Sequence, residues 1–133
     1  MPGQLTYLTL PVADLPSAAR FYERVFGWPP PRCVPNAAFF ELPGLTLALM
    51  ERAAFNQFTD TADASAPTSA LVSWNVPRRE EVAELVRRAT AEGATVRREP
   101  ATLAWGGHAG IIATPDGQLW EIVWNPRAAM RAS

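Results

Sequence analysis

The chain has 133 residues, a length that suits one compact domain with a real core. Apolar residues make up 48% of the sequence and charged residues 19%, a balance that excludes an intrinsically disordered chain. The formal net charge of -1, with no long run of one sign, gives no electrostatic basis for binding nucleic acid or an anionic membrane surface.

The chain begins with a predicted strand and helix. The segment QLTYLTLPV alternates with period two and predicts a strand that ends near Val12. The next segment, DLPSAARFYERVFG, predicts a helix, because Asp14 or Leu15 suits the cap and Pro16 suits the first turn. Gly27 suits the left-handed end of this helix. The apolar face of the helix comprises Ala18, Phe21, Tyr22 and Val25.

A hairpin and a loop follow. The segments AAFFEL and LTLALME, separated by a Pro43-Gly44 turn, predict two antiparallel strands. The segment RAAFNQFTDTADASAPT, residues 52–68, is predicted to be a loop, since its later half is small and polar.

The second half predicts the same kinds of element. SALVSWNV and ATVRRE predict strands, and REEVAELVRRATAEG predicts a helix that ends at Gly93. The charged face of this helix predicts solvent-exposed pairs of Glu and Arg, to which we assign no function. PATLAWGGHAG predicts a loop, and GIIAT and QLWEIVW predict a closing hairpin around residues 115–117. The apolar face of the second helix comprises Val82, Leu85, Val86 and Ala89.

The two halves follow one plan and indicate an internal duplication of about 60 residues. Phe21 lies nine residues after Val12, and Leu85 lies nine residues after Val76. Each half ends in a hairpin turned by a Pro and a Gly. A half of this size cannot bury its sheet alone, so we expect the two halves to pack or pair.

The residue types in the sequence exclude some reactions and indicate the cellular location of the protein. Every basic residue is an arginine, which excludes Schiff-base chemistry on lysine. The single cysteine, Cys33, excludes an intramolecular disulfide and is interpreted as an ordinary loop residue. The N-terminus has no basic stretch followed by an apolar run, and no apolar run approaches the roughly 20 residues of a membrane helix. We therefore expect a cytoplasmic protein.

Three segments carry a resemblance to a known superfamily: LPVADLPSAARFYERVFGW, GATVRREPATLAWGGHAG and TPDGQLWEIVWNP. Over residues 4–127 the chain resembles the glyoxalase / bleomycin-resistance / extradiol-dioxygenase superfamily, also called vicinal oxygen chelate. The resemblance implies an α+β fold of two βαβββ modules that form a curved mixed-sheet cup, with one helix outside each module. Residues 1–133 would then form a single domain, with modules at about 4–60 and 68–127 and a tail at 128–133. We also expect a homodimer.

The resemblance implies a divalent metal in the enzymes of this superfamily, held by His, Glu or Gln on the first and last strands of each module. Counting through the duplication places the four ligand slots at Tyr7, Ala48, Leu71 and Glu121. Only Glu121 is a usual ligand, so we expect no resident metal and doubt metal-dependent glyoxalase or dioxygenase activity. Two alternatives stay open. The slots shift by one residue, to Thr6, Met50, Val72 or Ser73, or His108 completes a site with Glu41 or Glu51.

Without a metal, the cup is expected to bind a small aromatic or apolar molecule. Alternation along the strands predicts the inward positions as Tyr7, Thr9, Ala48, Met50, Ser73, Asn75, Glu121 and Val123. Trp74 and Trp124 are further candidates for the walls. The predicted ligand-binding set is Tyr7, Phe39, Met50, Ser73, Asn75, Trp105, His108 and Glu121.

The role of Glu121 stays open among three readings. It is a structural carboxylate, a contact for a cationic or hydrogen-bond-donating ligand, or the catalytic general base of a metal-free enzyme. In the last case His108, in a glycine-rich loop, is the candidate titrating partner. The alternative functions are a metal-dependent lyase, isomerase or dioxygenase that uses Glu121, a metal-free enzyme, or a scaffold with a filled cup.

Overall fold

The computed structural model of the chain describes residues 3, 5–59 and 70–126. Within them the chain forms eight strands and three helices. The chain divides into two compact units, Met1–Pro67 and Thr68–Ser133, here called the first and second units. The predicted tail, 128–133, lies outside the described residues. None of the helices that the structure describes is long and apolar enough to cross a membrane.

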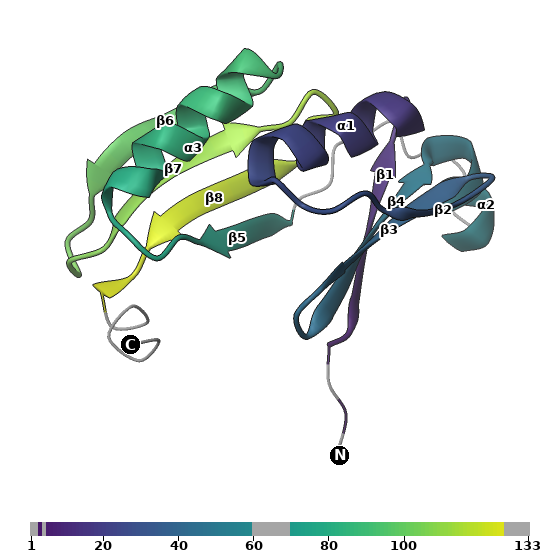
Figure 1. The fold of residues 1–133 in the computed structure, drawn as a ribbon, viewed down its shortest axis with the longest axis horizontal. Coiled ribbons are helices and arrows are strands. Elements are labelled where there is room, and N and C mark those ends of the chain that lie inside the picture. The colour runs from purple at the N-terminus through teal and green to yellow at the C-terminus, as the bar shows by residue number, and fades with distance from the viewer. Residues whose placement is uncertain (1–2, 4, 60–69, 127–133) are drawn as a thin grey trace. The chain divides into compact units, whose positions relative to one another are not determined.

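The first unit is a βαβββ module followed by a short helix (Figure 1). Its strands form one sheet in the order β1-β4-β3-β2, in which β1 runs parallel to β4 and the other pairs are antiparallel. The elements are β1 (Tyr7–Val12), α1 (Leu15–Phe26), β2 (Arg32–Val34), β3 (Ala37–Leu42), β4 (Leu45–Glu51) and α2 (Arg52–Thr59).

The second unit repeats the module with the order β5-β8-β7-β6 and the same pattern of parallel and antiparallel pairs. This correspondence of strand order is what the predicted duplication requires, and the α+β fold of two βαβββ modules is confirmed. The elements are β5 (Leu71–Asn75), α3 (Glu80–Ala91), β6 (Thr95–Thr102), β7 (His108–Ala113) and β8 (Leu119–Trp124).

Helix α1 begins and ends at the residues that its sequence predicts. The Asp14 side chain accepts a hydrogen bond from the backbone N–H of Ser17 at 3.1 Å, and a proline lies in the first turn. Gly27 ends the helix with φ 69°, a conformation that costs a side chain free energy and that glycine adopts freely. The four residues predicted to form its apolar face are all buried.

Each sheet buries one face beneath its helix. In the first unit α1 contacts β3 and β4, where Phe40, Leu47 and Leu49 are almost fully buried. In the second unit α3 lies across β6, β7 and β8 (Figure 1), where Ile112 and Ile122 are fully buried. The opposite face of each sheet carries the alternate side chains of the same strands. We call it the open face of that unit.

Three elements differ from the sequence prediction. Residues 52–59 form α2 rather than a loop, because they follow β4 without a Gly or Pro and the helix packs against β4 and β1. The short strand β2 was not predicted within its Pro-rich surroundings. Strand β6 continues to Thr102 through two irregularities of register, and β7 begins at His108, so the predicted loop at 100–110 is shorter.

Candidate functional site

Glu121 is the one carboxylate of β8, whose other residues are apolar, and alternation explains its position. Its chain neighbours Trp120 and Ile122 are 2% and 0% exposed and belong to the core beneath α3. Successive side chains of a strand point to opposite faces. Glu121 is half-buried and therefore lies on the open face, in the central part of the sheet between β5 and β7.

The carboxylate of Glu121 is held by its neighbour on β5. Ser73 is the register partner of Glu121, and its hydroxyl donates a hydrogen bond to Oε1 at 2.8 Å. Among the described residues this is the one hydrogen bond of the Glu121 side chain. The second oxygen, Oε2, is thus left to interact with solvent or a ligand.

A pocket of about 240 Å³ lies beside Glu121. Its floor includes Ala109 and Ile111 of β7, and its far wall is formed by β6. Arg98 is the basic side chain in this wall, and it makes no ion pair within the part of the chain that the structure describes. The pocket therefore holds the Glu121 carboxylate on β8 and the Arg98 guanidinium on β6, with a second carboxylate, Glu99, beside Arg98. Arg98 was not among the predicted site residues, although it lies in a predicted strand between two other charged residues.

The first unit has a larger and more apolar pocket, of about 660 Å³, at one end of its open face. Phe39 and Met50, both in the predicted ligand-binding set, line it. Helix α2 supplies another wall through Ala54, Gln57 and Phe58, which the sequence prediction of a loop could not place. The guanidinium of Arg32 lies 4.4 Å from the ring centre of Phe39 and holds that ring on one side.

The other predicted inward positions also lie on the open faces. Tyr7 and Thr9 pair with the β4 positions 46 and 48, and Asn75 pairs with Val123. Tyr7 and Asn75 are exposed, and neither lines the two pockets described above.

His108 does not reach Glu121. It pairs with Trp124 in the β7–β8 register, which places it on the helix side of the sheet with Trp120 and Ile122. Its Nδ1 lies 3.4 Å from the hydroxyl of Thr102. The predicted titrating pair of His108 and Glu121 is wrong, because the strand begins earlier than expected and the alternation puts the two side chains on opposite faces.

The tryptophan predictions are corrected in the same way. Trp74 pairs with Ile122 and shares the helix side of the sheet with Trp124, so neither closes the open-face pocket. Trp105 is 50% exposed in the turn between β6 and β7 and does not line the pocket beside Glu121. Its ring lies over Gly107, where a Cβ would overlap the indole.

The residues do not fit the divalent-metal centre that the resemblance implies. The slots Tyr7 and Leu71 begin their parallel ladders, and Ala48 and Glu121 lie two residues beyond the partners of those slots. Three of these four side chains are not ligands for such a metal. No group of three or more His, Cys, Asp or Glu residues is arranged to hold a metal ion anywhere in 5–59 or 70–126.

The residues considered as alternative ligands do not complete a metal site. Glu41 lies 3.7 Å from the guanidinium of Arg32, which competes for its carboxylate. Glu51 pairs in register with Val12, on the helix side of the first sheet. Shifting the slots by one residue adds Ser73, whose hydroxyl donates to Glu121. No metal-dependent step follows from these residues.

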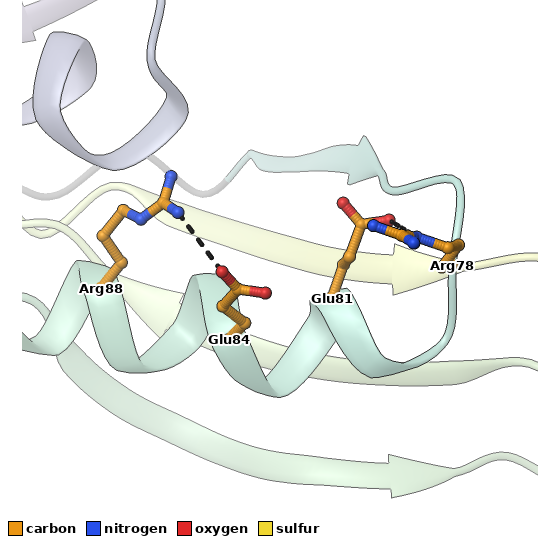
Figure 2. Close-up of polar contacts among 4 residues, drawn as sticks. All are labelled: Arg78, Glu81, Glu84 and Arg88. Carbon is orange, nitrogen blue, oxygen red and sulfur yellow. Dashed lines mark hydrogen bonds and ion pairs between the residues drawn. The ribbon is translucent and has the colours of Figure 1, made fainter.

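The charged residues of α3 form a separate, solvated surface (Figure 2). Arg78 contacts Glu81 at 3.0 Å and Arg88 contacts Glu84 at 3.5 Å. The hydrogen bond and the charge of Glu81 raise the pKa of Arg78 above its ordinary value. Exposed pairs of this kind contribute little to stability, and they lie on α3 and the segment just before it rather than on an open face.

Comparisons with known proteins agree with this geometry. The family model of the Glyoxalase/Bleomycin resistance protein/Dioxygenase superfamily matches residues 4–122. A glyoxalase-related enzyme from Fulvimarina pelagi is similar at 36% identity, with a TM-score of 0.87 over 92% of this chain and 88% of that one. A family enzyme from Burkholderia phytofirmans PsJN has the same fold at 20% identity, with a TM-score of 0.84 over 92% and 98% of the two chains. No curated protein matches the chain.

Proposed function

The chain belongs to the glyoxalase/bleomycin resistance protein/dioxygenase superfamily, and we propose that it binds a small aromatic or apolar molecule in the pocket on the open face of its first unit. The observation that carries the proposal is the composition of that pocket. Phe39, Met50 and Phe58 come from three different elements and line one open groove with a volume of about 660 Å³. This volume lies within the roughly 300–1,000 Å³ of small-molecule sites, which combine apolar walls with a few polar groups.

The chemistry of the lining favours a flat ligand. Phe39 offers a ring for stacking, and Met50 offers a polarizable thioether that adapts to an aromatic edge. Asn36 and Gln57 supply the polar points that would orient the ligand. The weak fit to a metal centre supports binding rather than metal-dependent turnover as the role of this site.

The direct test is to fill the pocket from α2. Ala54 lines the pocket, whereas its neighbour Ala53 is exposed and does not. Ala54→Phe should abolish the binding of planar aromatic compounds, detected by ligand-observed NMR, and Ala53→Phe should leave it unchanged. Both variants should unfold at similar temperatures, because neither replaced side chain is part of the buried core. Equal binding by both variants would overturn the proposal.

A second function is favoured by one specific contact. The Ser73 hydroxyl donates a hydrogen bond to one oxygen of Glu121, and the Glu121 side chain lines a pocket. A carboxylate so placed is able to act as a general base in a metal-free enzyme, taking a proton from a carbon next to a carbonyl. Incubation with carbonyl compounds in deuterated water would reveal exchange at that carbon by NMR. Exchange that is present in the wild type and lost in Glu121→Gln would establish this function, and its absence would leave binding alone.

A further inference from the structure

The structure assigns a second binding site to the pocket of the second unit: we propose that Arg98 and Glu121 together bind a small zwitterion of amino-acid size, with a carboxylate on Arg98 and an ammonium group on Glu121. This site is independent of the apolar pocket of the first unit. It rests on a row of side chains across one sheet.

The row crosses the open face of the second unit along the register. Ser73 pairs with Glu121, Glu121 with Ile111, and Ile111 with Arg98. Two strand spacings separate Arg98 from Glu121, so their Cα atoms lie about 10 Å apart. Both side chains line the pocket, and Ile111 forms its floor between them. Glu121 and Arg98 thus lie on opposite sides of one small apolar span, and Glu99 adds a second carboxylate on the Arg98 side.

The first unit provides an internal comparison for Arg98. The equivalent row is Thr9, Ala48, Phe39 and Arg32. There the guanidinium of Arg32 stacks on Phe39 at 4.4 Å and contacts Glu41 at 3.7 Å. It is therefore already occupied by groups of its own sheet.

Arg98 has neither of these partners. Ile111 stands where the first unit has Phe39, so no ring lies beneath the guanidinium in the row. The described residues form no ion pair or ring contact with Arg98. The duplication has therefore kept an arginine at the edge of both rows but has left the second one available. A guanidinium in this position recognises a carboxylate through paired N–H donors.

Glu121 completes the charge pattern. Ala48 stands at its place in the first unit, so the carboxylate is particular to the second row. The Ser73 hydroxyl holds Oε1 at 2.8 Å and so orients Oε2 without neutralising the charge. An ammonium group is the complementary ligand, since it adds a charge-assisted hydrogen bond.

The volume limits the size of the ligand. A cavity of about 240 Å³ is smaller than the roughly 300–1,000 Å³ of pockets for drug-sized ligands. This space suits a chain of a few carbon atoms with a charged group at each end. A large aromatic compound would exceed it, which separates this site chemically from that of the first unit.

The test uses ω-amino acids of increasing length: glycine, β-alanine, 4-aminobutanoate and 5-aminopentanoate. Binding to the full chain is followed by saturation-transfer NMR up to about 10 mM, a range that covers weak binding of small ligands. We expect at least one length to bind. Butanoate and butylamine should bind with an affinity at least about tenfold lower, since each lacks one charge-assisted hydrogen bond.

Variants locate the site. Glu121→Gln and Arg98→Met should each weaken binding of the best ω-amino acid about tenfold or more. Arg97→Met is the matched control, because Arg97 is exposed on the same strand but does not line the pocket. Thermal unfolding of each variant verifies that the fold is retained. No binding by any ω-amino acid, or binding that both Glu121→Gln and Arg98→Met leave unchanged, would overturn the proposal, whatever the outcome for the first-unit pocket.

Discussion

At the scale of single residues, the two repeated sheets carry different side chains at one equivalent central position. Glu121 and Ala48 occupy equivalent places, each opposite a hydroxyl residue on the parallel strand, Ser73 or Thr9. Only the second of these pairs forms a hydrogen bond between side chains among the described residues. Comparing the two sheets therefore shows what the Glu121 carboxylate adds to stability beyond what the shared fold provides.

Ser73→Ala should lower the free energy of unfolding by about 1 kcal/mol or less, because it removes one hydrogen bond from a partly solvated carboxylate. Urea denaturation measures the change. Thr9→Val is the matched control, and it should have a smaller effect because its neighbour Ala48 offers no acceptor. A larger loss for Thr9→Val than for Ser73→Ala would show that the hydrogen bond between Ser73 and Glu121 does not stabilise the fold.

Residue-level prediction worked where the start of a strand could be read from the sequence. Counting along β1, β4, β5 and β8 placed Tyr7, Met50, Ser73 and Glu121 on the open faces. It failed for His108, which was expected in a glycine-rich loop over the pocket but lies at the start of β7, where alternation puts it on the helix side of the sheet. Arg98 was missed because its role depends on neighbours across the sheet.

At the scale of elements, α1 is the clearest case of local signals that agree with the fold. Its cap, its proline and its final glycine all match the observed helix. Helix α2 is the opposite case: it carries neither a Pro at its start nor a Gly at its end, and it is stabilised by packing against β4 and β1. Such tertiary stabilisation cannot be read from a local window, although α2 forms a wall of the proposed site.

Gly27→Ala should destabilise the protein by about 1 kcal/mol, because alanine at φ 69° is strained. No neighbouring atom lies within 4 Å of the added Cβ, so the cost is conformational rather than steric. Thermal or urea unfolding measures it. Gly3→Ala is the control, since Gly3 also has open space and does not have a positive φ. Equal stability of Gly27→Ala and wild type would show that alanine is not strained at this helix end.

At the scale of the whole molecule, the fold could be predicted from the sequence, because period-two strands, two amphipathic helices and a repeated plan all agree. The binding pockets could be predicted only in part. The positions of the open faces follow from alternation, but pockets depend on how side chains of separate strands fill the space between them. The apolar pocket needed α2, and the charged pocket needed the β6–β7 register.

The residue set predicts that divalent metals do not stabilise the protein. A thermal-shift scan with Mn, Fe, Co, Ni and Zn salts should leave the unfolding temperature unchanged, because a metal that binds only the folded state would raise it. The metal content of freshly purified protein should be far below one per chain. A stoichiometric metal, or a shift of several degrees that Glu121→Ala abolishes, would show that ligands outside the four slots complete a site.

The chain is expected to form a homodimer. Leu5 is 77% exposed and Tyr7, two residues later, is 52% exposed, and exposed apolar surface that gathers in one place is typical of association surfaces. Light scattering after size-exclusion chromatography should give twice the 14.5 kDa of one chain. A mass of 14.5 kDa across a range of protein concentrations would contradict this expectation.

The most direct test of the proposed aromatic site follows the methyl group of Met50. The chain has three methionines, so a spectrum of protein labelled with ¹³C at the methionine methyl group contains three signals, and Met50→Leu assigns the one from the pocket. During titration with planar aromatic compounds, we expect the Met50 signal to move through ring contact and Ala54→Phe to prevent the change. An unchanged Met50 signal with every compound, or a shift that Ala54→Phe does not prevent, would contradict the proposal that this pocket binds an aromatic molecule.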